Sequence, residues 1–262
     1  MSAVIIIPAR YASQRYPGKP LVELRDGSGV SKTLIERSWD AAVAVLDVAD
    51  VYVATDDDRI ADCVRGFGGQ VIMTDPACRN GTERCAQAVE VAGIDADIIV
   101  NLQGDAPLTP AWFVADLIAA MEANPADMVA TPVLRCDAET LQNFRDDRAA
   151  GKVGGTTAVF GADMNGLYFS KEVIPYLPPE GPDPSQSIPV FHHVGVYAYR
   201  RVALADYAAA SPMPLETLEG LEQLRFLELG LPVRCVEVDG KGRVFWELNN
   251  PVDVARIEKV LA

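Results

Sequence analysis

The sequence has little histidine, fewer bases than acids and no long apolar run. Its 262 residues include only two histidines, the neighbours His192 and His193. The chain therefore cannot build a metal site or an acid–base pair from histidines at separate positions. It carries 23 Lys and Arg against 37 Asp and Glu, a net charge of −14. Broad binding to nucleic-acid backbones or anionic membranes needs massed bases, so we expect any phosphate site to be local.

Cysteine usage and apolar patterning narrow the class of protein further. The five cysteines are odd in number and show no C-x-x-C spacing, which disfavours disulfide frameworks and zinc sites and favours a reducing cytoplasm. No apolar run approaches the ~18 residues of a membrane helix, so we expect no membrane insertion. The apolar run at residues 4–7 has no basic region before it, and we expect no signal peptide. A hydrophobic content of 49% indicates an ordinary folded core.

Short β-branched runs alternate with longer segments of helical period in the first half of the chain. Such alternation predicts an α/β fold, a mostly parallel sheet between layers of crossover helices. The expected strands cover residues 4–7, 51–54, 71–73, 98–100 and 128–131, and the expected helices cover residues 32–45, 57–67, 82–91 and 109–122.

The second half of the chain is less regular. Polar sequence runs to about residue 155, and a Pro-rich stretch lies between later strands, which favours a meander or flap attached to the sheet. Strands are expected over residues 157–160, 166–169, 194–199 and 233–238, and helices over residues 215–229 and 251–261. The last helix is expected to begin at Pro251, after a cap at Asn249 and Asn250.

A basic window without any acid follows the first expected strand. It contains Arg10, Arg15 and Lys19 between Pro8 and Pro20. Loops at the carboxyl ends of parallel strands form the ligand crevice of such sheets. Arginine forks and a lysine point charge there suit a polyphosphate, although the window lacks P-loop spacing. The alternative is a solvated loop whose charges offset acids elsewhere.

A carboxylate follows the expected strand at residues 98–100. Asp105 stands beside Gly104 and faces the same predicted crevice. Mg²⁺ prefers oxygen ligands and commonly joins one or two carboxylates to substrate phosphates, which makes Asp105 the best candidate metal ligand. The alternative is an Asp turn that only begins the next helix.

Three weaker features complete the candidates. Gly81 and Thr82 at a helix start offer backbone N–H groups to an anion or carbonyl, unless Thr82 only caps its own helix. His193 and Tyr197 stand four residues apart near a strand. The leucine spacing of residues 215–225 indicates a core-facing stripe.

Seven segments add a resemblance to a known family. They are IIIPARYASQRYPGKPL from Ile5, VATDDDRI from Val53, GTERCA from Gly81, VNLQGDAPL from Val100, LYFSK from Leu167, HVGVYAYR from His193 and PLETLEGLEQLR from Pro214. In this order and spacing they resemble the CMP-Kdo synthetases, the bacterial 3-deoxy-manno-octulosonate cytidylyltransferases, across nearly the whole chain. The resemblance implies a three-layer, Rossmann-like nucleotidyltransferase fold. Residues 1–262 would form a single domain, with residues 132–200 as a β-rich flap that contacts the sugar acid and a second copy.

The resemblance also implies a reaction and a site. CTP and a 3-deoxy-2-ulosonic acid, Kdo or a close relative, would give the CMP-sugar and pyrophosphate, with Mg²⁺ as cofactor, in a cytoplasmic homodimer. By similarity, the nucleotide would contact Arg10, Ser13, Arg15, Lys19, Gly81 and Arg84, and catalysis would depend on Arg10, Lys19 and Asp105. The sugar acid would contact Gln103, Lys171, His193, Tyr197, Glu222 and Gln223.

Departures from the family pattern fall at the expected metal and sugar sites. Where the family carries Val-Asp-Thr-Pro-Glu-Asp, whose first Asp is a second metal ligand, this chain has Asn249. Asn249 is expected to bind Mg²⁺ more weakly through its carbonyl oxygen, or Glu247 compensates. Lys171 and His192 replace stronger bases, and a point charge does not recognise a carboxylate as an arginine fork does. The flap segment at residues 151–157 does not align with the family's Lys-Val-Val strand.

Two other functions stay open from the sequence. One is a cytidylyltransferase for another sugar acid, such as sialic acid, or for a sugar phosphate. The other is a catalytically weakened homologue that keeps the fold and binds nucleotide after losing the carboxylate at Asn249.

Overall fold

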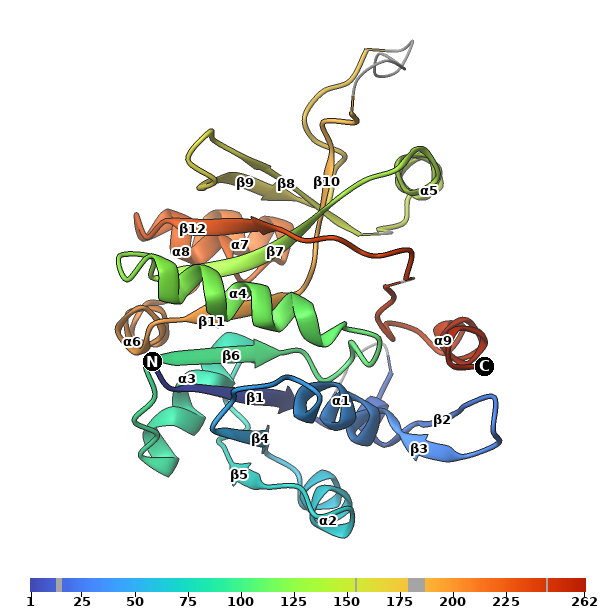
Figure 1. Cartoon of the computed structure of the whole chain (residues 1–262), viewed down its shortest axis with the longest axis vertical. Helices are drawn as coiled ribbons and strands as arrows, with labels where there is room; N and C mark the ends of the chain where they lie inside the picture. The colour runs from blue at the N-terminus through green and yellow to red at the C-terminus, as the bar shows by residue number, and fades with distance from the viewer. Residues whose placement is uncertain (13–15, 154, 179–186, 244) are drawn as a thin grey trace.

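One mixed β-sheet extends through the molecule and carries helices on both faces (Figure 1). The computed structural model describes residues 1–12, 16–153, 155–178, 187–243 and 245–262. The strands of the sheet are β1 (Ala3–Ala9), β4 (Asp50–Thr55), β5 (Val71–Met73), β6 (Ile98–Leu102), β7 (Val129–Arg135), β8 (Thr156–Phe160), β9 (Gly166–Ser170), β10 (Phe191–His193), β11 (Val196–Tyr199) and β12 (Val233–Glu237). Their order is β5-β4-β1-β6-β11-β7-β10-β8-β9, with β12 paired to β7.

The β-branched runs form the parallel part of the sheet. β1 lies parallel between β4 and β6, and β4 is parallel to β5. Alternate residues of β1 enter opposite cores: Val4 and Ile6 on one face, Ile5 and Ile7 on the other. Burial on both faces explains why this strand is a continuous apolar run rather than an alternating one. The strands expected in the first half of the chain are confirmed.

Helices cover both faces of the sheet, which confirms the three-layer α/β fold. On one face pack α1 (Leu34–Val43), α2 (Asp58–Gly66) and α4 (Ala111–Ala123), and on the other α3 (Gly81–Ala92), α6 (Arg201–Ala209) and α8 (Leu224–Glu228). Helices α1, α2, α3 and α4 match the expected helices to within a few residues. Among the described helices, none combines the length and the apolar character needed to cross a membrane.

From β11 onward the neighbouring strands of the main order pair antiparallel, with β12 parallel to β7, and the sheet extends away from the parallel strands. The strands β10, β8 and β9 and the helix α5 (Ala138–Ala149) lie at this end, at the top of Figure 1. The strands expected at residues 157–160 and 166–169 are confirmed here. Helix α5 occupies sequence expected to be irregular. Only Leu141 and Phe144 of this helix are buried, so its apolar stripe is too narrow to stand out by period.

Two expected elements differ in extent from those in the structure. The strand expected at residues 194–199 is shorter in the structure, because β11 begins only at Val196, and Val194 and Gly195 separate it from β10, a strand that was not expected. The helix expected at residues 215–229 is α7 (Pro214–Glu219) followed by α8. Gly220 ends α7 with φ 63°, a left-handed conformation that favours glycine. The break leaves Leu218 83% exposed, so the expected core stripe is wrong there.

The C-terminal segment packs beside a small hairpin. Helix α9 (Asp253–Leu261) shares a core with the hairpin of β2 (Glu23–Arg25) and β3 (Ser31–Thr33). The expected cap is reversed, since Asp253 inside the helix accepts the backbone N–H groups of Asn249 and Asn250. The helix therefore begins two residues after Pro251, and the segment before it is fixed by Asp253.

Candidate active site

The carboxyl ends of β1 and β6 open into a cleft of about 1950 Å³. β1 and β6 are parallel, so the residues that follow them emerge at one edge of the sheet. β11 runs antiparallel to β6 with Val196 opposite Leu102, which brings the residues before β11 to the same edge. The predicted site residues that line the cleft are Arg10, Lys19, Gly81, Arg84, Gln103, Asp105, Lys171, His193, Tyr197, Glu222, Gln223, Glu247 and Asn249. Ser13 and Arg15 lie outside the described residues.

One wall of the cleft is ionic and partly exposed. The Nζ of Lys19 lies 2.5 Å from the Oδ2 of Asp105, and their side chains are 14% and 25% exposed. Arg10 is exposed and its guanidinium donates to the carbonyl of Arg79 at 3.4 Å. A phosphate or cation that binds here competes with the Lys19–Asp105 ion pair. We name Arg10, Lys19 and Asp105 the ionic wall.

Glycine at position 104 allows the turn after β6 to approach the end of β1. A Cβ at Gly104 would lie 2.8 Å from the carbonyl oxygen of Pro8, a distance that forces backbone to move. The hydroxyl of Ser38 donates to the Gly104 carbonyl at 3.1 Å and holds the turn from the helix side. The position of Asp105 is therefore set by close backbone packing rather than by a flexible loop.

The segment that carries Glu247 and Asn249 is fastened to Asp105. The backbone N–H of Leu248 donates to the carbonyl of Asp105 at 2.8 Å, and the amide of Asn249 donates to a carboxylate oxygen of Glu247 at 3.4 Å. In the described part of the chain, no group of three or more His, Cys, Asp or Glu side chains is arranged to hold a metal. Asp105 with one neighbouring oxygen donor fits Mg²⁺, which takes one or two protein carboxylates when phosphates and water complete its coordination.

A second wall of the cleft is built around Glu222: His193, Tyr197 and Gln223 are buried, and Glu222 and Gln103 are partly buried. One carboxylate oxygen of Glu222 accepts from the Nε2 of Gln103 at 2.8 Å, and the other from the backbone N–H of Thr82 at 2.9 Å. Burial raises the pKa of Glu222, and hydrogen bonds from Thr82 oppose this shift. A Cβ at Gly81 would lie 2.9 Å from the Nε2 of Gln103, so glycine leaves room for that amide. The N-cap of α3 is Asn80 rather than Thr82.

Beside Glu222, the amide of Gln223 is held by one end only. The hydroxyl of Tyr197 donates to its Oε1 at 3.0 Å, which fixes the orientation of the amide. Gln223 is 1% exposed, and its Nε2 has no hydrogen-bond partner among the described residues. Buried donors in native proteins are almost always paired, so this one is a candidate contact for a ligand oxygen. Burial raises the pKa of Tyr197, which keeps its hydroxyl protonated.

His193 is neutral and its tautomer is determined by its neighbours. The side chain is buried, and burial together with His192 lowers its pKa to about 3. Its Nε2 lies 2.9 Å from the hydroxyl of Thr131, and that hydroxyl donates to the carbonyl of Val196 at 2.8 Å. Since Thr131 has a single proton, the Nε2 of His193 donates and its Nδ1 is left as an acceptor. We name Gln103, His193, Tyr197, Glu222 and Gln223 the buried wall.

Two further predicted residues lie at the margins of the cleft. Lys171 follows β9, and its backbone N–H donates to Glu219 at 3.0 Å. Its Nζ lies beside Gly220, 2.9 Å from the position that a Cβ at Gly220 would take. Arg84 is 2% exposed, lies 3.3 Å from the Oδ2 of Asp56 and donates to Thr74 at 2.6 Å. The charge of Arg84 is thus already paired with that of Asp56.

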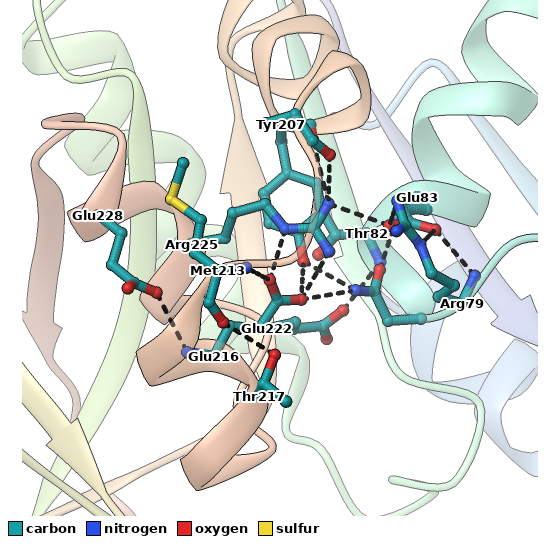
Figure 2. Close-up of polar contacts among 12 residues, drawn as sticks. Arg79, Thr82, Glu83, Tyr207, Met213, Glu216, Thr217, Glu222, Arg225 and Glu228 are labelled. Atoms are coloured by element: carbon teal, nitrogen blue, oxygen red, sulfur yellow. Dashed lines mark hydrogen bonds and ion pairs between the residues drawn. The ribbon is translucent and has the colours of Figure 1, made fainter.

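A buried ion-pair network next to Glu222 was not found by sequence reasoning. The guanidinium of Arg225 contacts Glu216 and Glu83, as Figure 2 shows. Glu216 and Arg225 are nine residues apart and lie on different helices, so no helical spacing indicates that they pair. The only sequence signal was Gly220, because a glycine inside a helical pattern disfavours a continuous helix.

Comparisons with known proteins bear directly on this cleft. A family model described as cytidylyltransferase matches residues 4–234. The chain belongs to the cytidylyltransferase family. This cytidylyltransferase is 45% identical over 262 residues to the 3-deoxy-manno-octulosonate cytidylyltransferase of Maricaulis maris, covering 100% of this chain and 98% of that one. It is 36% identical over 258 residues to the mitochondrial 3-deoxy-manno-octulosonate cytidylyltransferase of Arabidopsis thaliana, covering 98% of this chain and 82% of that one.

Solved structures agree with the sequence comparisons. The cytidylyltransferase superposes on CMP:2-keto-3-deoxy-manno-octonic acid synthetase, solved as a complex with CTP, with a TM-score of 0.83 and 34% identity over 100% of this chain and 98% of that one. A 4-diphosphocytidyl-2C-methyl-D-erythritol synthase of Anaerococcus prevotii shares the fold alone, with a TM-score of 0.56 and 12% identity over 99% of this chain and 96% of that one. The nucleotidyltransferase fold and the resemblance to the 3-deoxy-manno-octulosonate cytidylyltransferases are confirmed.

Proposed function

We propose that this cytidylyltransferase transfers CMP from CTP to the anomeric hydroxyl of a 3-deoxy-2-ulosonic acid, Kdo or a close relative, and releases pyrophosphate. The observation that carries the proposal is the meeting of two unlike walls in one cleft. The ionic wall suits a triphosphate, and the buried wall suits a ligand rich in hydroxyl and carboxylate oxygens. The likeness to 3-deoxy-manno-octulosonate cytidylyltransferases and to a synthetase solved with CTP supports the same pairing of substrates.

The chemistry needs positioning and charge neutralisation rather than a protein nucleophile. The sugar oxygen attacks the α-phosphorus in line, a new P–O bond forms, the bond to the bridging oxygen breaks, and the hydroxyl proton is released. Arg10 and Lys19 would neutralise the charge that develops on the phosphates as pyrophosphate leaves. Asp105 would release Lys19 toward the triphosphate as its own carboxylate takes another cation.

A magnesium ion is part of this proposal. The oxygen donors beside Lys19 fit it: Asp105 would hold the ion, and Asn249 or Glu247 would complete the protein's share of its coordination. When bound, Mg²⁺ would supply further neutralisation of the triphosphate charge. A homodimer formed through residues 132–200 and a cytoplasmic location also belong to the proposal.

The buried wall gives the proposal its second substrate. The Nε2 of Gln223 is a fixed donor without a protein acceptor among the described residues, and the Nδ1 of His193 is an acceptor. A donor and an acceptor held in a buried wall select a polyhydroxylated ligand, because a ligand without matching oxygens would leave them unpaired. Lys171 lies at the margin of the same cleft and would balance the carboxylate of a sugar acid.

The direct test is pyrophosphate release by the purified chain with CTP and Mg²⁺. Kdo, a sialic acid and a sugar phosphate are compared as acceptors, and UTP and GTP replace CTP as nucleotide controls. We expect release with CTP and Kdo well above every other combination. Release that is strongest with the sialic acid moves the function to another sugar acid. No release with any 3-deoxy-ulosonic acid overturns the proposal and favours a weakened nucleotide-binding homologue.

A further inference from the structure

Arg225 is fully buried behind the cleft and joins elements that are distant in sequence. Its Nε and Nη2 each donate to an oxygen of Glu216 at 2.6 Å, and its Nη1 donates to Glu83 at 3.0 Å (Figure 2). Its guanidinium carbon lies 3.9 Å from the centroid of the Tyr207 ring. One side chain of α8 therefore binds α7, the first turn of α3 and the inner face of α6.

A second, uncharged link holds the same parts together. Asn80 is the N-cap of α3, and its Oδ1 accepts the backbone N–H of Glu83. Its Nδ2 donates to the hydroxyl of Tyr207 at 2.8 Å and to Glu216 at 3.3 Å. The start of α3 is thus fastened to α6 and α7 by the same residues that bind Arg225.

Glu222 spans the two parts that this network joins. It lies in the turn between α7 and α8, and its carboxylate accepts from the backbone N–H of Thr82, next to Glu83, at 2.9 Å. Its backbone carbonyl accepts the N–H of Arg225 at 3.3 Å. A displacement of the turn relative to α3 would separate Glu222 from Thr82.

A contribution to stability does not by itself explain why this ion-pair network is present. Desolvating a guanidinium and two carboxylates is costly, and apolar packing of similar volume often stabilises a protein as well or better. What the network supplies in addition is direction, since a bidentate contact fixes the angle between its partners.

We propose that Arg225 is a positioning residue for the sugar-acid pocket. Its contacts with Glu216 and Glu83 hold the α7–α8 turn against the start of α3, and so set where Glu222 and Gln223 stand in the cleft. The inference rests on the proposed function where the test measures the KM for the sugar acid. A second consequence, the hydrogen-exchange rate of the Thr82 amide, can be measured without any enzymatic activity.

The kinetic test is Arg225→Lys, which keeps the charge and removes the fork. We expect the KM for the ulosonic acid to rise between about 10-fold and 100-fold, as small misplacements of a binding group do, while the KM for CTP changes less than about twofold. Arg37→Lys is the matched control, because Arg37 is also buried and donates two hydrogen bonds to the carbonyl of Leu24, outside the cleft. It should lower stability and leave both KM values unchanged.

A double-mutant cycle tests whether Arg225 acts through Glu222. If it does, Arg225→Lys in the background of Glu222→Gln should raise the KM for the ulosonic acid by less than about twofold, because the group it positions is already impaired. If the KM increases of the two single variants multiply in the double variant, the proposal is overturned. Equal increases in both KM values, or a result for Arg225→Lys that matches Arg37→Lys, would also overturn it. If Arg225→Lys does not fold, Glu216→Gln loosens the same contact from the other side and is read in the same way.

Hydrogen exchange at the Thr82 amide separates failure of this inference from failure of the proposed function. Thr82 stands in the first turn of α3, where backbone N–H groups have no partner within the helix, so its protection depends on Glu222. We expect Arg225→Lys to speed exchange of this amide by roughly tenfold or more, and Arg37→Lys to leave it unchanged. Unchanged exchange in Arg225→Lys overturns the inference whether or not the wild type releases pyrophosphate.

Discussion

The two walls of the cleft handle charge in opposite ways. In the ionic wall, Lys19 and Asp105 neutralise each other at 2.5 Å and remain in contact with solvent. In the buried wall, burial itself suppresses charge, lowering the pKa of His193 to about 3 and raising that of Glu222. We expect the first arrangement to reorganise when a phosphate or cation binds, whereas the second is already fixed by hydrogen bonds within the protein.

Because the walls differ in this way, substitutions in the two walls should change different kinetic constants. An ionic group that acts on the developing charge of the transition state affects turnover, and a fixed hydrogen-bonding group affects recognition. Substitutions in the ionic wall should therefore lower kcat, and substitutions in the buried wall should raise the KM of the sugar acid. The comparison fails if the two sets of variants have the same kinetic signature.

The largest effect is expected from Asp105→Asn. The substitution keeps the size of the side chain but removes the charge that pairs with Lys19 and would bind Mg²⁺, so we expect kcat to fall roughly 1000-fold. Steady-state pyrophosphate release measures it, and the circular dichroism spectrum should not change. Asp58→Asn, in the first turn of α2 and outside the cleft, is the control. A near-normal kcat for Asp105→Asn would remove Asp105 from catalysis.

Glu222→Gln should act on recognition instead. An amide can accept at only one end, so its NH₂ group would face either the Thr82 N–H or the Gln103 amide, two donors in place of a donor and an acceptor. We expect the KM of the ulosonic acid to rise about 10-fold to 100-fold, since an unmatched buried polar group costs about 1–3 kcal/mol. Glu228→Gln, a capping residue of α7, is the control. A fall in kcat at constant KM would erase the distinction between the walls.

The elements that the sequence predicts well are those whose signal is local. Residues 4–7 and 98–100 are β-branched runs buried on both faces, and the loops that follow such strands must meet at one edge of the sheet. That reasoning alone brings Arg10 and Asp105 into one cleft. The roles of the buried-wall residues came from the family resemblance, and without it Glu222 would be missed, because no periodicity distinguishes it from its neighbours.

What could not be predicted depends on contacts between distant segments. Thr82 and Glu222 are 140 residues apart, and nothing in either segment specifies the other. The pairing of Arg225 with Glu216 appears only once Gly220 has divided the helix and turned α8 back toward α7. Helix α5 was missed because tertiary packing at two positions, rather than a wide apolar face, stabilises it.

The neutrality of His193 in the folded protein predicts a pH dependence of stability. The pKa of His193 is lowered from 6.5 to about 3, so the unfolded chain takes up a proton at a pH where the folded protein does not. This contribution to stability is complete above pH 6.5 and is lost as the pH falls toward 3. As the pH falls through this window, we expect the free energy of unfolding of the wild type to decrease by about 1.4 kcal/mol per pH unit more than that of His193→Gln. Urea unfolding at several pH values measures the difference, and equal slopes would mean that His193 is charged in the folded state.

The smallest expected effect concerns the partner of Asp105 in the ionic wall. Asn249→Asp adds a carboxylate beside Asp105, and because Mg²⁺ affinity increases with ligand charge, the Mg²⁺ concentration for half-maximal rate should fall roughly fivefold. Glu247→Gln should raise that concentration by a similar factor if Glu247 supplies the charge that Asn249 lacks. Glu247→Gln without effect would leave Asn249 as the second ligand, since the N–H of Leu248, the residue between them, bonds to the Asp105 carbonyl. If neither variant alters the Mg²⁺ dependence, Asp105 is the protein's only ligand in this segment and the triphosphate completes the coordination.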